Sequence, residues 1–151
     1  MDNVAYDLAA AIADERGTGR VLCTFFGTPM SVTDLAEASG LHPDTKNYQR
    51  CSEGEARSNA GRAISRNLSD GEDLIPKDRA KEIVKTFLDQ FVGETKAFYT
   101  NGEFRFIGSY AFLGRWRQVT PERMSCGMLV LDERSSGVLW VADKIPSERA
   151  A

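Results

Sequence analysis

A change of hydrophobic period near Gly93 constrains the fold more than any other feature of the sequence. Before this glycine, apolar residues recur at the three- and four-residue spacing of helices, and after it they alternate with polar residues as in strands. Residues 76–91 carry the most regular helical stripe, and residues 94–145 hold several short runs rich in β-formers. A chain of 151 residues suffices for one ordinary domain or two very small ones. We therefore expect an α+β protein.

Capping residues predict three further helices. The first begins at Asp2 or Asn3 and stops at Gly17. Ser31 and Ser52 each precede an acidic residue by three positions, as in a capping box. The expected helices cover residues 2–16, 31–39 and 53–68. The last of these contains Gly61, which weakens a helix by roughly 1 kcal/mol relative to alanine. Because glycine has no side chain, it also leaves room for another group to approach the helix closely.

The remaining segments predict the sheet. Residues 20–26 fit a short strand or a short buried helix. Asn101-Gly102 is typical of a two-residue hairpin turn, which would place Tyr99 opposite Phe104. We expect a five-stranded antiparallel meander over residues 94–145, with the 76–91 helix on one face. The chain then divides into a helical subdomain, 1–75, and a helix-plus-sheet subdomain, 76–151, with one compact domain as the alternative.

Charge is unevenly distributed along the chain. The net charge is −3, and the first 50 residues hold seven acidic and four basic side chains, so they account for all of it. Two windows contain no acid, residues 56–69 and 104–121. Such windows indicate either a solvated face or a local basic patch that binds an anion, and a net charge near neutrality hides patches of this kind.

No arrangement of residues indicates an enzyme, a metal site or a cofactor. The one histidine, His42, stands beside a proline in an expected turn. Cys23, Cys51 and Cys126 are an odd number without close spacing, which argues against a disulfide framework and a zinc site. Asp132-Glu133 lies in an expected hairpin turn, where acids are common. We expect neither cofactor nor metal.

The sequence also bears on location. No apolar run approaches the roughly 20 residues that cross a bilayer, and the first residues lack the basic region of a signal peptide. We therefore expect a cytoplasmic or virion-internal protein without a membrane partner.

Aromatic and basic residues interleave between residues 104 and 117. Sheets that bind single strands combine arginines with stacking rings in this way. The simpler interpretation places the aromatic residues in the core and the arginines in solvent. This secondary basic and aromatic patch comprises Arg105, Arg115, Trp116 and Arg117.

Residues 31–41 resemble the first helix and turn of a bacterial winged-helix or helix-turn-helix domain. The matching positions are Ser31, Asp34, Leu35, Ala36, Gly40 and Leu41. The resemblance covers about residues 19–68 and implies a recognition helix at residues 59–68, with 42–52 as an insertion. Helix pairs of this kind bind DNA or dock proteins, and a fold does not by itself decide between the two.

These observations favour a DNA-binding regulatory protein. In this hypothesis the polar arc of the 53–68 helix enters the major groove, where arginine reads guanine and asparagine reads adenine. The expected contacts are Arg57, Ser58, Asn59, Arg62, Ser65 and Arg66. The sheet half would form a homodimer, bind an effector or dock a partner. The alternative is a small interaction protein, an inhibitor or adaptor of phage or mobile-element origin, that docks on another protein.

Overall fold

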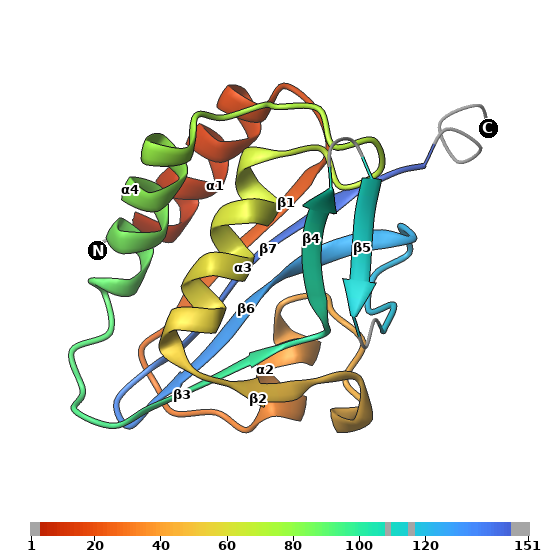
Figure 1. Ribbon diagram of the computed structural model, residues 1–151. Coiled ribbons are helices and arrows are strands. Elements are labelled where there is room, and N and C mark those ends of the chain that lie inside the picture. Colours follow the sequence, from red (N-terminus) through yellow and green to blue (C-terminus); the bar gives the residue numbers. More distant parts are fainter. Residues whose placement is uncertain (1–3, 108–109, 115–116, 146–151) are drawn as a thin grey trace.

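The computed structural model describes residues 4–107, 110–114 and 117–145, and within them the side chains outside 103–116. It shows an α+β fold, in which helices dominate the first part of the chain and strands the second (Figure 1). The helices are α1 (Val4–Arg16), α2 (Val32–Ala38), the short 3-10 helix η1 (Thr45–Asn47), α3 (Glu53–Ser65) and α4 (Lys77–Leu88). The strands are β1 (Arg20–Phe26), β2 (Gln49–Cys51), β3 (Lys96–Thr100), β4 (Glu103–Ile107), β5 (Tyr110–Gly114), β6 (Met124–Asp132) and β7 (Ser136–Asp143).

Five strands form one antiparallel sheet in the order β1-β7-β6-β3-β2. The expected α+β class and the five-stranded antiparallel sheet are confirmed. The membership of the sheet differs from the expected meander, because β1 and β2 join it while β4 and β5 pair only with each other. Strands from before and after residue 75 therefore share one sheet.

The predicted hairpin at Asn101-Gly102 is wrong. Strand β3 pairs with β6 and β2 instead of β4, and Tyr99 lies opposite Leu129. Asn101 is buried, and its side-chain amide donates to the carbonyls of Arg117 (2.8 Å) and Ser125 (3.0 Å). Gly102 does take a positive φ of 152°. The two residues form a corner at which the chain leaves the sheet, held by contacts that a local turn pattern does not contain.

Each face of the five-stranded sheet carries its own apolar core. On one face, α1, α3 and α4 cover alternate strand residues such as Met128 and Val141. On the other face, α2 covers the intervening residues, among them Leu129 and Trp140. Figure 1 shows α3 crossing the sheet with α1 and α4 beside it. This two-sided cover explains why the apolar run of β6 is nearly continuous, since both of its faces are buried.

The sheet separates the two helices that the helix-turn-helix resemblance pairs. Helix α2 belongs to one core and α3 to the other, so they lie on opposite faces. The segment 42–52, which the resemblance treats as an insertion, contains η1 and the edge strand β2, which pairs with β3. The helix packing that the resemblance implies thus differs from the packing observed.

The expected capping interactions are present. The Ser31 hydroxyl accepts the Asp34 N–H, and Ser52 and Glu55 form a complete capping box. Helix α3 ends at Ser65, earlier than expected, because Arg66 is extended and forms an isolated bridge with Asp73. Helix α4 starts at Lys77.

A buried ion pair joins α1, the end of α3 and β7. Arg16 and Asp143 are 3% and 1% exposed, and two guanidinium nitrogens of Arg16 donate to the Asp143 carboxylate at 3.0 and 2.8 Å. The remaining Arg16 donors reach the carbonyls of Ile64 (3.1 Å) and Arg66 (2.7 Å) at the end of α3. Asp143 also accepts the Leu68 N–H at 2.9 Å. These bonds satisfy both charges away from water.

We expect Arg16→Ala to lower the free energy of unfolding by about 3–5 kcal/mol, because it leaves the Asp143 carboxylate buried without its cation. The control is Arg79→Ala, which removes a half-exposed pair with Glu15 and should cost at most about 1 kcal/mol. Urea denaturation followed by circular dichroism measures both. Similar small losses in the two variants would show that the buried pair is not a major support of the fold.

Candidate functional site

A groove of about 700 Å³ lies between α3 and α4. Helices α3 and α4 are in contact with each other, and residues of both line the hollow between them. Helix α3 contributes Arg57, Ser58, Gly61, Arg62 and Ser65, and Arg66 follows directly after it. Helix α4 contributes Lys77, Ala80, Lys81, Val84 and Lys85.

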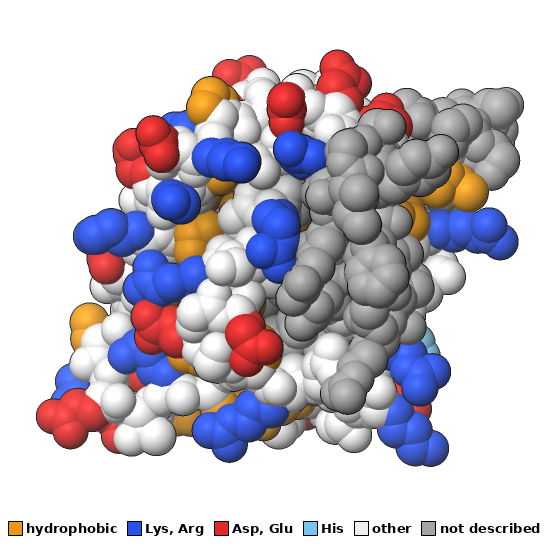
Figure 2. All heavy atoms as spheres, in the orientation of Figure 1, with side chains coloured by type: hydrophobic (Ala, Val, Ile, Leu, Met, Phe, Trp, Pro, Cys, Tyr) orange, Lys and Arg blue, Asp and Glu red, His pale blue; other side chains and the backbone are white. Residues whose placement is uncertain are grey.

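Six of the lining residues are cationic and none is acidic. Figure 2 shows several blue side chains around a small orange area on this face, with red side chains at its margins. Lys77, Lys81 and Lys85 follow one another at four-residue intervals, so they form one ridge with steps of about 6 Å. The nearby carboxylates of Glu53, Asp73 and Asp89 pair with lining cations but do not line the groove themselves.

The floor of the groove is apolar and shallow. Ala80 and Val84 of α4 are almost fully buried, and Gly61 of α3 has no side chain. The aliphatic stems of lysine and arginine add apolar surface beneath their charged ends. The groove therefore offers charge along its rims and apolar contact at its base.

The structure corrects the expectation that all six residues proposed for α3 lie on an exposed face. Arg57 and Ser58 are exposed, and Arg62 and Arg66 are half-buried in the wall of the groove. Ser65 is only 7% exposed and Asn59 only 3%. The position of Asn59 on the helical wheel predicted that its side chain would face solvent. Instead, the corner at residues 101–102 covers that part of α3.

The Asn59 amide forms part of a buried polar network. It donates to the Thr100 hydroxyl at 2.7 Å and lies within hydrogen-bond distance of the carbonyls of Gly102 (3.2 Å) and Gly127 (3.3 Å). Its nitrogen also lies 2.8 Å from the Cys126 sulfur. Because the side chain is also buried, the amide cannot reach a base edge in this state.

The secondary basic and aromatic patch is only partly described. The side chains of Arg105, Arg115 and Trp116 lie outside the described side chains, whereas Arg117 is exposed. The Arg117 backbone N–H donates to the Asn101 carbonyl at 3.0 Å, so its main chain helps to hold the corner.

The lysines of α4 are the part of the groove that the sequence did not assign. Their four-residue spacing was visible, but alone it indicates only the solvent face of an amphipathic helix. What makes them a site is their position across from the α3 arginines. That position depends on the course of residues 66–76 between the two helices.

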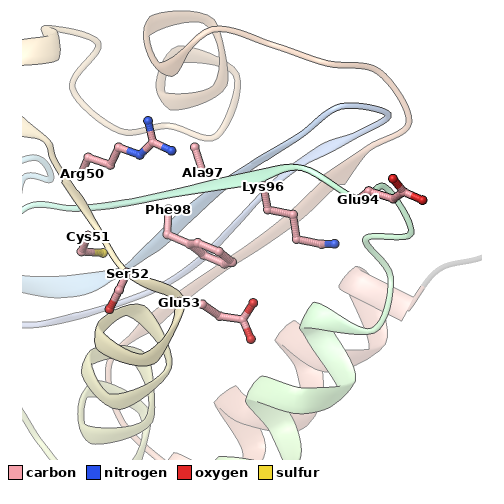
Figure 3. Close-up of a pocket in the computed structure, with 8 residues that line it drawn as sticks. All are labelled: Arg50, Cys51, Ser52, Glu53, Glu94, Lys96, Ala97 and Phe98. Carbon is pink, nitrogen blue, oxygen red and sulfur yellow. The ribbon is translucent and has the colours of Figure 1, made fainter.

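A second pocket, of about 440 Å³, lies beside β2 and β3 (Figure 3). It contains a thiol, Cys51, together with Ser52 and Lys96. Burial, followed by the charge of Glu55, raises the pKa of Cys51 to about 11. The Ser52 hydroxyl caps α3, and the Lys96 ammonium donates to the Gly93 carbonyl. These polar groups have structural partners, and the pocket joins no nucleophile to a base.

The other two cysteines and the histidine are also buried, half-buried or hydrogen-bonded within the fold. Burial raises the pKa values of Cys23 and Cys126 to about 12. The His42 Nδ1 accepts the Asp44 N–H at 3.2 Å and lies 3.1 Å from the Asn47 amide nitrogen. Within the described residues, His, Cys, Asp and Glu form no group of three that could hold a metal ion.

No helix in the described part of the chain has the length and apolar character needed to cross a membrane. No family model, curated protein or solved structure matches the chain.

We expect Asn59→Ala to destabilise the fold by about 1–3 kcal/mol, because the buried groups that the amide now contacts lose their donor. Its neighbour Ser58 is exposed, so Ser58→Ala should change stability by less than about 0.5 kcal/mol. Urea denaturation of the two variants measures the difference. Equal, small effects would contradict a structural role for Asn59.

The cysteines should react slowly with thiol reagents in the folded protein. With the pKa of Cys51 at about 11, only about one thiol in a thousand is ionised at pH 8. We expect iodoacetamide to label the folded chain poorly at pH 8 and all three cysteines in 8 M urea, as measured by intact mass. Rapid labelling of folded protein would reveal an activated thiol.

Proposed function

We propose that this protein is a cytoplasmic binding protein that docks an acidic segment of a partner protein in the groove between α3 and α4. The observation that carries the proposal is the gathering of six cations around one apolar hollow, on a chain whose net charge is −3. Local charge opposite in sign to the whole protein marks a surface for a complementary partner, because it steers the encounter and fixes orientation.

The apolar floor favours a protein segment over duplex DNA. A phosphate backbone has no apolar group that could pack against Gly61, Ala80 and Val84. A peptide with acidic and apolar side chains can bind the cations of the rims and pack on the apolar floor at the same time. Asn59, the side chain suited to reading adenine, is buried. The exposed cations remain able to contact phosphates, so DNA binding is the competing outcome of the test below.

The first test compares two probes, each labelled with fluorescein. One is a 16-residue peptide of glutamate, leucine and alanine with leucine at helical spacing, and the other is a 20-base-pair duplex of random sequence. We expect the peptide to bind, with an affinity that falls as salt rises, since salt screens exposed charges. Fluorescence anisotropy from 50 to 300 mM NaCl gives both affinities.

Matched charge reversals test whether the groove is the site. Lys77→Glu combined with Lys81→Glu should weaken peptide binding about tenfold or more, equivalent to at least ~1.4 kcal/mol. Lys46→Glu combined with Lys144→Glu changes the net charge equally at two exposed positions outside the groove, and should change binding less than about twofold. Equal losses in both variants, no peptide binding, or tighter binding of the duplex would each overturn the proposal.

A further inference from the structure

The fold does not require a glycine at position 61. Gly61 lies in the interior of α3, where glycine is less favourable than alanine. A Cβ added at Gly61 would meet no heavy atom within 4 Å outside its own helix. At Gly127, in contrast, a Cβ would come within 2.0 Å of the Leu139 carbonyl oxygen and 2.7 Å of the Trp140 Cα. The fold therefore demands Gly127 and does not demand Gly61.

The place where Gly61 lies explains what its missing side chain exposes. Gly61 lines the groove between α3 and α4, with Ala80 and Val84 among the residues on the α4 side. Because these residues are small, the α3 backbone is open to anything that enters the groove. Small residues of this kind let a second helix approach closely, since the side chains at the contact set the distance between helix axes.

The groove suits a helical occupant better than an extended one. An extended peptide needs partners for its own N–H and C=O groups, and in known complexes it finds them at a sheet edge. The walls here are two helices that satisfy their backbone groups internally. Apart from Ser58 and Ser65, the polar side chains that line the groove are lysines and arginines, which donate but do not accept. A helix brings its own backbone hydrogen bonds and needs only side-chain contacts.

We infer that the groove takes an acidic, amphipathic α-helix of the partner, with its small or apolar face against Gly61 and its carboxylates toward the cationic rims. This inference rests on the proposed function and specifies the conformation of the occupant. Carboxylates at four-residue intervals on the helix match the step of about 6 Å between Lys77, Lys81 and Lys85.

Substitution of the glycine tests the inference without unfolding the protein. Gly61→Leu places a side chain on the floor of the groove, and we expect it to weaken binding of the acidic peptide tenfold or more. The matched control is Gly54→Leu in the first turn of the same helix, where a Cβ meets only the Ser52 hydroxyl at 3.9 Å and which does not line the groove. It should change affinity less than twofold. Thermal melting should show that both variants remain folded.

A second pair of probes separates helix from extended chain. A peptide of the same composition with leucine at every second position should bind at least tenfold more weakly than the helical pattern. Equal affinity for the two patterns, or unchanged binding in Gly61→Leu, would overturn the inference. The proposed function would survive either result if the Lys77→Glu and Lys81→Glu variant still lost affinity, whereas failure of every acidic peptide to bind would overturn both.

Discussion

The buried pair of Arg16 and Asp143 holds α1, the end of α3 and β7 against one another. It joins α1 to β7 across 127 positions of the chain, and its remaining donors hold the last carbonyls of α3. The approach is so close that a Cβ at Gly19 would lie 2.2 Å from the Asp143 carboxylate, and Gly19 takes a φ of 82°. By fixing the end of α3 against the sheet, the pair also fixes one wall of the basic groove. The candidate site thus depends on a contact that lies outside it.

Local chemistry was enough to predict most individual elements of the fold. The Ser52–Glu55 capping box, α4 and the β6–β7 hairpin follow from side chains near one another in sequence, and the structure has all three. The order of the strands could not be predicted in this way. It depends on the pairing of β1 with β7 and on the hydrogen bonds of the Asn101 amide to two distant carbonyls. Neither contact can be predicted from the local pattern of hydrophobic and turn residues.

For the same reason, only the α3 side of the candidate site could be predicted from the sequence. The acid-free window of residues 56–69 indicated a basic face on α3, and Arg57, Ser58, Arg62 and Arg66 do line the groove. The burial of Asn59 was not foreseeable from the helical wheel, because the corner that covers it comes from another part of the chain. The lysines of α4 became part of a site only when the fold brought them opposite α3. A helical wheel shows which residues share a face of a helix, but it does not show which other elements pack against that face.

The pairing of β1 with β7 has a consequence for biosynthesis. Strand β1 is an edge of the sheet, and its one neighbour there is β7, with Arg20 opposite Ala142. A ribosome that adds roughly 5–20 residues per second makes β1 about ten seconds before its neighbour emerges. During that interval the nascent chain carries an unpaired strand with the sequence RVLCTFF, rich in the residues that associate with other strands. Strand β1 therefore gains its neighbour in the sheet only after β7 (Ser136–Asp143) has emerged.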